Sequence, residues 1–136
     1  MTNPTEQYAF TLEMSVRDYE LDLLGMVNNG VYQGYLEHAR HEYLKQIGID
    51  FAAMHEEGYR LVVVRAELDY KQTLHSGDRY VVGVTMARES RVKFRFDQGI
   101  YRLGDMAPVV IAKIIGTGLK ASGRPGLPPK LTELFP

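Results

Sequence analysis

One change of hydrophobic period constrains the fold of this chain more than any other feature. Apolar side chains between residues 31 and 47 recur at steps of one, three and four, which is the spacing of one helix face. The members of this stripe are Val31, Tyr32, Tyr35, Leu36, Ala39, Tyr43, Leu44 and Ile47. From Tyr59 onward, apolar residues alternate with polar ones, which is the period of a β-strand. The chain therefore has to bury one long helix against a sheet.

Five segments carry the alternating or β-branched pattern of strands. They cover residues 8–16, 60–71, 79–88, 91–101 and 108–119. Short turns separate the last four, which predicts antiparallel hairpins. We expect an α+β architecture in which a five-stranded, mainly antiparallel sheet wraps the long helix. Because free sheet edges tend to be paired or protected, we also expect a dimer at least.

The ends of the helices are marked by capping residues. The long helix is expected over about Asn29–Ile47, with Gly48 as its stop. Asp50 is placed to cap a second, shorter helix over residues 51–57. The order of elements is therefore strand, long helix, short helix and four strands.

Composition excludes several classes of function. A net charge of −1 argues against a nucleic-acid partner or an acidic membrane surface. The absence of cysteine excludes disulfides, thiolate nucleophiles and cysteine metal sites. No apolar run approaches the roughly 20 residues that span a bilayer, and the first residues show no leader pattern. We expect one cytoplasmic domain over residues 1–136 without a membrane partner, in which residues 1–7 and 121–136 are loose ends.

The segment between the first strand and the long helix carries the candidate chemistry. It contains the carboxylates Asp18, Glu20 and Asp22 and ends at the helix-capping residues 28–30. A helix N-terminus presents unpaired backbone N–H groups and a partial positive charge. A carboxylate beside it can therefore attack a carbonyl whose oxyanion the N–H groups hold. Taken alone, however, an aspartate such as Asp22 is more often a turn residue that bonds its own backbone.

The same residues resemble a known family. The run Asp22-Leu23-Leu24-Gly25-Met26-Val27, followed by Asn29 and Tyr32, resembles the signature of hotdog-fold thioesterases of the 4-hydroxybenzoyl-CoA thioesterase type. The longer run 16–22, with residues 27–29, 34–35, 40–42 and the turn 74–78, resembles most closely the plant and cyanobacterial acyl-carrier-protein thioesterases of that family. The resemblance covers about residues 8–120 and implies the hotdog fold.

This resemblance implies an enzyme that cleaves an acyl thioester of acyl carrier protein or coenzyme A. The aspartate matching Asp22 is the catalytic carboxylate of the family, acting as nucleophile or as general base on water. Backbone N–H groups at the helix start, here Asn29, Gly30 and Val31, polarise the thioester carbonyl. Several relatives carry His where this chain has Asn29, and an amide cannot act as a base, although it can donate a hydrogen bond.

Further residues are assigned to substrate binding. Tyr32 is expected to line the acyl pocket; the other candidates for that lining are Met26, Tyr35, Phe51 and Met54. Arg91 and Lys93 form either a solvated strand face or a clamp for the phosphates of the carrier, two interpretations that are equally supported. Arg65 stands in a run of valines and should be paired, at the substrate or at a subunit interface.

Two alternatives remain open at the level of sequence. The first is an aromatic or polyketide acyl-CoA thioesterase, and the second is a non-catalytic protein that binds acyl thioesters. Glu37, on the long helix, is the reserve catalytic carboxylate. No cofactor and no metal are expected, because the spacing of His38, His41, His55 and His75 lacks a third ligand.

Overall fold

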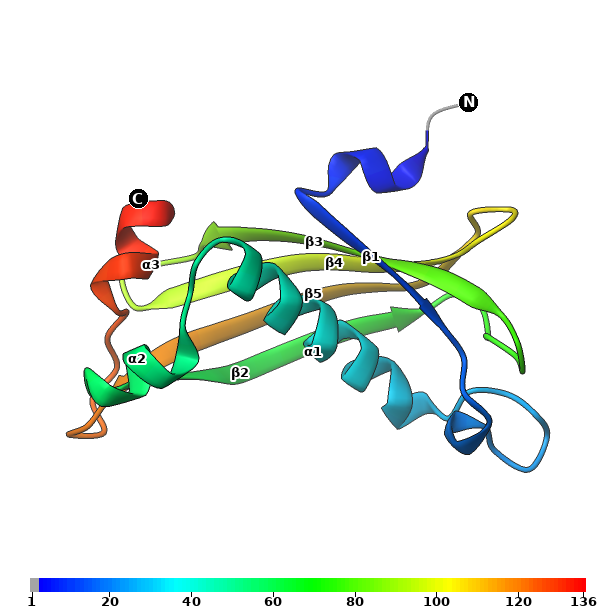
Figure 1. The fold of residues 1–136 in the computed structure, drawn as a ribbon, viewed down its shortest axis with the longest axis horizontal. Coiled ribbons are helices and arrows are strands. Elements are labelled where there is room, and N and C mark those ends of the chain that lie inside the picture. Colours follow the sequence, from blue (N-terminus) through cyan, green and yellow to red (C-terminus); the bar gives the residue numbers. More distant parts are fainter. Residues whose placement is uncertain (1–2) are drawn as a thin grey trace.

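The computed structural model describes residues 3–136 and consists of one long helix packed on a curved sheet (Figure 1). The elements are η1 (Pro4–Gln7), β1 (Phe10–Ser15), η2 (Asp18–Glu20), α1 (Asn29–Gln46), α2 (Phe51–Glu56), β2 (Tyr59–Tyr70), β3 (Arg79–Arg88), β4 (Lys93–Arg102), β5 (Pro108–Lys120) and α3 (Pro129–Leu134). The predicted α+β class and the order of the main elements are confirmed.

The five strands form one antiparallel sheet in the order β1-β3-β4-β5-β2. Helix α1 crosses one face of this sheet and packs mainly on β1, β3 and β4 (Figure 1). The buried side chains of α1 include Tyr32, Tyr35, Leu36 and Ala39, which are all members of the predicted stripe. Close contacts of α1 with β5 and β2 are fewer.

Capping groups fix both ends of α1 as the sequence predicts. The side chain of Asn28 accepts a hydrogen bond from the N–H of Gly30. The helix ends before Gly48, whose φ of +89° favours a residue without a side chain. The carboxylate of Asp50 then accepts hydrogen bonds from the first turn of α2.

The C-terminal segment differs from the irregular tail that its Gly and Pro content predicts. Helix α3 begins after Pro128, and Leu131 on it is only 2% exposed. The segment also runs tightly along β5, because a side chain at Gly118 would collide with the backbone oxygen of Gly126. A prediction from composition missed this packing, since one buried leucine in a short segment carries no periodicity.

Strand β2 is a long edge with little cover. Most of its residues are exposed, and Val63 and Val64 keep 51% and 50% of their surface. The pairing with β5 is interrupted by an irregularity between Val63 and Arg65. Among the described residues, no helix combines the length and the apolar character needed to cross a membrane.

Candidate active site

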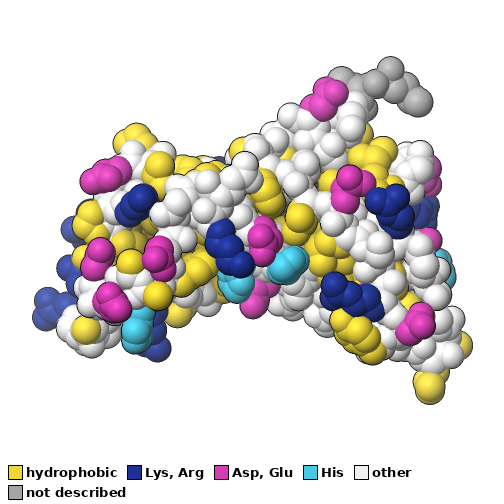
Figure 2. Space-filling model, viewed as in Figure 1, with side chains coloured by type: hydrophobic (Ala, Val, Ile, Leu, Met, Phe, Trp, Pro, Cys, Tyr) yellow, Lys and Arg dark blue, Asp and Glu magenta, His cyan; other side chains and the backbone are white. Residues whose placement is uncertain are grey.

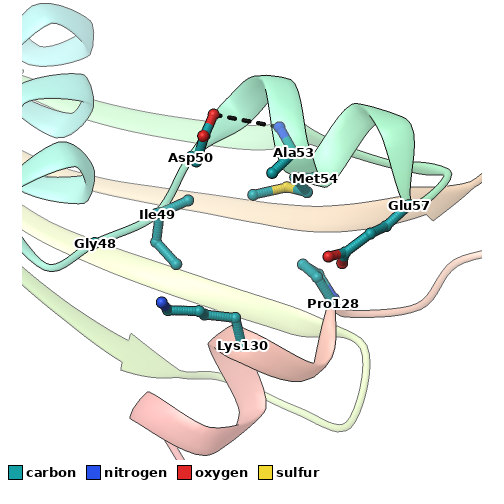
Figure 3. A pocket seen from close by; sticks show the side chains of 8 residues that line it. All are labelled: Gly48, Ile49, Asp50, Ala53, Met54, Glu57, Pro128 and Lys130. Atoms are coloured by element: carbon teal, nitrogen blue, oxygen red, sulfur yellow. Dashed lines mark hydrogen bonds between the residues drawn. The ribbon is translucent and has the colours of Figure 1, made fainter.

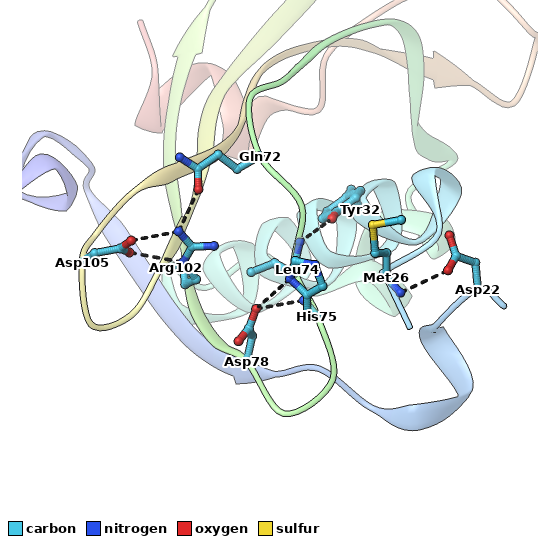
Figure 4. A network of polar contacts seen from close by, with 9 residues as sticks. All are labelled: Asp22, Met26, Tyr32, Gln72, Leu74, His75, Asp78, Arg102 and Asp105. Carbon is cyan, nitrogen blue, oxygen red and sulfur yellow. Dashed lines mark hydrogen bonds and ion pairs between the residues drawn. The ribbon is translucent and has the colours of Figure 1, made fainter. Parts of the chain in front are cut away.

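Asp22 stands in a tight loop at the N-terminal end of α1 (Figures 1 and 4). Its Oδ1 atom accepts hydrogen bonds from the N–H of Leu24, at 2.8 Å, and from the N–H of Met26, at 3.1 Å. Gly25 completes the turn with a φ of +79°. The side chain is thus a turn former, as its position in the loop alone suggests. Its second oxygen, Oδ2, has no hydrogen-bond partner within residues 3–136, and the residue is exposed.

The neck of this loop is closed by backbone hydrogen bonds to its surroundings. The N–H of Asn28 donates to the carbonyl of Glu20 at 3.1 Å, and the N–H of Val27 donates to the carbonyl of Leu74 at 2.9 Å. Met26 forms a bridge with His75 on the same turn. The turn 74–78, whose residues resemble those of the same family, is therefore bonded directly to this loop.

The first turn of α1 has fewer free donors than its sequence suggests. The N–H of Gly30 is bonded to the side chain of Asn28 at 3.2 Å, and the N–H of Val31 to the carbonyl of Asn28 at 2.9 Å. Of the three backbone groups expected to polarise a carbonyl, only that of Asn29 has no acceptor in the described chain. Asn29 is exposed, so both its backbone N–H and its side-chain amide are accessible.

Tyr32 is placed as a structural support of the loop. Its side chain is 2% exposed, and its hydroxyl accepts a hydrogen bond from the N–H of Leu74 at 3.0 Å (Figure 4). The ring of Tyr70 stands edge-on to it, and the Tyr70 hydroxyl donates to the carbonyl of Asn29 at 3.4 Å. The structure thus gives Tyr32 a position beside the loop but buries it, whereas Tyr70 is exposed near the start of α1.

Glu20 is the buried member of the three loop carboxylates. Its Oε1 atom accepts a hydrogen bond from the Tyr35 hydroxyl at 2.7 Å and another from the N–H of Arg17 at 2.7 Å. Burial, and then the bond to Glu20, raise the pKa of Tyr35 well above its ordinary value. Nothing in the sequence distinguishes Glu20 from Asp18 as the carboxylate that becomes buried.

A groove runs between α1 and β2. It begins near Gln33, one turn from Asn29, and reaches Phe51 on α2. Its walls are mostly apolar, with Leu36, Leu44, Leu61, Val62, Val63, Ala66, Phe94, Phe96 and Ile114 among them. Glu37, the reserve carboxylate, lies on the same groove and is exposed.

The floor of this groove contains a buried cation that the sequence analysis did not single out. Arg40 is 8% exposed and donates to the side-chain oxygen of Gln98 at 3.1 Å. Gln98 in turn donates to the carbonyl of Leu36 at 3.0 Å, and the guanidinium lies 5.8 Å from the ring centre of Phe96. Burial lowers the pKa of Arg40, although the charge of Glu37 opposes this effect.

The three other cations assigned to substrate binding lie apart from Asp22. Strand β4 starts at Lys93, so Arg91 stands in the β3–β4 turn rather than on a strand. That turn is at the far end of β3 from the Asp22 loop (Figure 1), about 33 Å along a ten-residue strand. Arg65 lies on β2, exposed and paired with Glu67 at 2.6 Å. Within one chain, none of them is brought to the carboxylate.

A second hollow lies between α2 and the C-terminal segment (Figure 3). It is lined by Gly48, Ile49, Asp50, Ala53, Met54, Glu57, Pro128 and Lys130. Met54, expected in the acyl pocket, faces this hollow, and the hollow is at the end of α1 that is remote from Asp22 (Figure 1). Phe51 lines the groove of α1 and β2 instead.

The distribution of charged side chains and of potential metal ligands bears on which partners and ions this protein can bind. Within residues 3–136, no group of three or more potential metal ligands is close enough to hold an ion. On the face drawn in Figure 2, acidic and basic side chains are interspersed among hydrophobic patches. This distribution agrees with the net charge of −1 and offers no basic stripe on that face.

The sequence profile of the thioesterase-like superfamily matches residues 16–135, so the chain belongs to that superfamily. Two chloroplastic acyl-acyl carrier protein thioesterases of Arabidopsis thaliana are similar. ATL3 is 38% identical over 114 residues, which cover 84% of this chain and 60% of that protein. ATL2 is 37% identical over 114 residues, with coverages of 84% and 61%. The chain spans about three fifths of the length of these relatives, and the predicted family is confirmed.

Solved structures of related proteins have the same fold. A thioesterase of Thermus thermophilus, complexed with coenzyme A and Zn, is 29% identical, with a TM-score of 0.80 over 94% of this chain and 92% of that chain. A 1,4-dihydroxy-2-naphthoyl-CoA thioesterase of Synechocystis has a TM-score of 0.84 over 91% of this chain and 92% of that chain. The latter is 20% identical, and its likeness concerns the fold alone. The predicted hotdog fold is confirmed.

Proposed function

We propose that this protein is an acyl thioesterase in which Asp22 is the catalytic carboxylate. The observation that carries the proposal is the geometry of the loop. One oxygen of Asp22 is bonded to the backbone and holds the side chain still, while the other is free and exposed. The loop ends directly at the N-terminus of α1, where Asn29 offers free donors for a carbonyl oxygen.

Two routes of hydrolysis are compatible with this arrangement. As a general base, Asp22 takes a proton from water, whose oxygen attacks the carbonyl carbon. As a nucleophile, the carboxylate attacks directly, and water then cleaves the resulting mixed anhydride. In both routes the carbon–sulfur bond breaks, the thiol leaves with a proton, and negative charge develops on the carbonyl oxygen next to Asn29. Gly30 joins the oxyanion site only if the Asn28 side chain releases its N–H.

The proposed substrate is an acyl thioester of acyl carrier protein or of coenzyme A. The names of the plant relatives support the first carrier, and the coenzyme A complex of the Thermus relative supports the second. The apolar groove that starts one turn from Asn29 suits an aliphatic chain. An aromatic or polyketide acyl group is the alternative within the same class, and stoichiometric binding without turnover is the alternative outside it.

We also propose that the protein works as a homodimer or a homotetramer. Strand β2 is an exposed, apolar edge that leaves backbone groups unpaired on its outer side. Pairing of β2 with the same strand of a second copy would satisfy those groups and cover the groove. We propose that any phosphate clamp of Arg91 and Lys93 acts across that interface, because within one chain both residues lie at the far end of β3 from the Asp22 loop.

The proposed function is tested by hydrolysis of a panel of short, long and aromatic acyl thioesters of both carriers. Asp22→Asn is the decisive variant, because asparagine keeps the Oδ1 acceptor of the turn and loses only the basic carboxylate. We expect kcat to fall at least about a thousandfold, at an unchanged melting temperature.

Asp18→Asn is the matched control, since it makes the same chemical change four residues earlier on an exposed side chain. It should retain wild-type turnover. Full activity of Asp22→Asn would remove the catalytic assignment. Tight binding of acyl thioesters by a wild-type protein that never turns them over would replace the enzyme with a binding protein.

A further inference from the structure

The acid two residues before Asp22 is buried, although it belongs to an exposed loop. Glu20 retains 9% of its surface, whereas Asp18 and Asp22 on either side of it are exposed. Burial of a carboxylate is costly unless hydrogen bonds compensate for the lost water. Within residues 3–136 no salt bridge reaches Glu20, and both of its side-chain hydrogen bonds come from neutral donors, although the charge of Arg17 also interacts with it.

One of these donors lies at the start of the active-site loop and the other on α1. The N–H of Arg17, where the loop begins, and the hydroxyl of Tyr35, on the second turn of α1, both donate to Oε1 of Glu20 at 2.7 Å. The backbone carbonyl of Glu20 also accepts the N–H of Asn28, where the loop ends. One residue therefore joins the first residue of the loop, the last residue of the loop and the body of α1.

Tyr35 is itself held in one position. Its ring is 3% exposed and packs on the ring of Tyr80 from β3, with centres 4.5 Å apart and planes at 34°. Its raised pKa keeps the hydroxyl protonated, so that it remains a donor over the ordinary pH range. The hydroxyl therefore fixes Glu20 against a rigid part of the core.

From these contacts we infer that Glu20 and Tyr35 are positioning residues that set where Asp22 stands relative to the N-terminus of α1. The inference rests on the proposed function for its catalytic consequence. Loss of the contact would leave Asp22 and its turn intact but free to shift as a unit. A displacement of about 1 Å between reacting groups can lower a rate as much as a hundredfold.

The first experiment compares Tyr35→Phe with Tyr43→Phe. Both variants delete the hydroxyl of a buried tyrosine of α1, but the hydroxyl of Tyr43, unlike that of Tyr35, makes no hydrogen bond to a described residue. We expect Tyr35→Phe to lower kcat about tenfold to a hundredfold with KM within about twofold, and Tyr43→Phe to match the wild type. Hydrogen exchange of the backbone of residues 18–28 should become faster in Tyr35→Phe only.

The second experiment uses Glu20→Gln and Glu20→Ala. Glutamine keeps the Oε1 acceptor that Tyr35 and Arg17 use, and Glu20 lines a hollow that leaves room for the amide nitrogen. We expect Glu20→Gln to stay within about threefold of wild-type kcat, while Glu20→Ala falls at least as far as Tyr35→Phe. This rescue is the signature of hydrogen-bonded positioning rather than of charge.

The outcomes separate the inference from the proposed function. Unchanged exchange of residues 18–28 in Tyr35→Phe, or faster exchange with an unchanged kcat, would overturn the inference while leaving Asp22 as the catalyst. Equal loss of kcat in Glu20→Gln and Glu20→Ala would overturn it as well. A wild-type protein without turnover would contradict the proposed function, and in that case the exchange measurement alone still decides whether Tyr35 holds the loop.

Discussion

Glu20 and Arg40 are two buried side chains of opposite charge, one packed against α1 and the other on it. Neither forms an ion pair within residues 3–136. Glu20 lies at the loop end of the helix and is bonded to a hydroxyl and a backbone N–H. Arg40 lies farther along the helix and is bonded to the amide of Gln98. The hydrogen-bond partners of both side chains are neutral, but they belong to different elements of the fold.

The partners of Glu20 connect a loop to the helix, whereas the partners of Arg40 connect the helix to the middle of the sheet. Gln98 is 1% exposed on β4 and also binds the carbonyl of Leu36. The Arg40 site therefore contributes to the stability of the core, and the Glu20 site determines the position of a loop. The comparison teaches that equal burial can serve either stability or function, depending on which elements are joined.

The largest effect on stability is expected at the Arg40 site. Gln98→Leu leaves the guanidinium buried without its acceptor, and the free energy of unfolding should fall by about 3 kcal/mol. The double variant Arg40→Met with Gln98→Leu removes both polar groups and should recover most of that loss. Urea denaturation measures the free energy of unfolding of both variants. A double variant as unstable as the single one would show that the unpaired guanidinium is not the cause of the loss.

An intermediate effect is expected at the second support of the loop. Tyr32→Phe deprives the buried N–H of Leu74 of its acceptor, and the free energy of unfolding should fall by about 1–2 kcal/mol. Because Leu74 also bonds the loop through Val27, kcat should fall with it. Chemical denaturation and steady-state kinetics on the same preparation measure the two quantities. A loss of stability with an unchanged kcat would show that Tyr32, like Arg40, contributes to stability and not, like Glu20, to the position of the loop.

The smallest effect is expected for an exposed ion pair. The hydrogen bond from Arg102 holds the pKa of Asp105 at about 2, below its ordinary value of 3.8. A depressed pKa contributes stability above the ordinary value and loses it as the pH falls from about 4 to about 2. Asp105→Asn should flatten the pH dependence of the melting temperature in that range and lower the melting temperature slightly at neutral pH, where the wild-type ion pair contributes its stability. If the melting temperature of the variant depends on pH as steeply as that of the wild type in this range, other carboxylates cause the dependence.

The sequence was sufficient for the fold because the governing patterns are periodic. The stripe of α1, its cap at Asn28 and its stop at Gly48 depend on neighbours within a few residues. Helix α3 has no such period, and its burial depends on Leu131 reaching a distant part of the core. Patterns of local spacing cannot contain that information.

The candidate site was predictable only in part, for the same physical reason. Asp22 and the helix start are neighbours in sequence, so their proximity follows from the chain itself. The pairing of Glu20 with Tyr35 requires the exact path of the loop, and the remoteness of Arg91 requires the direction of β3. Alternation placed Arg91 on a strand face, whereas the hairpin turn in fact includes it.

The order of strands in the sheet has a consequence for synthesis of the chain. Phe10 of β1 pairs with Val84 of β3, and the sheet under α1 is completed only by β4. At a translation rate of about 5–20 residues per second, α1 leaves the ribosome several seconds before the strands that cover its apolar face. During that interval the nascent helix is an amphipathic segment without its docking surface, which makes it a natural site for chaperone capture.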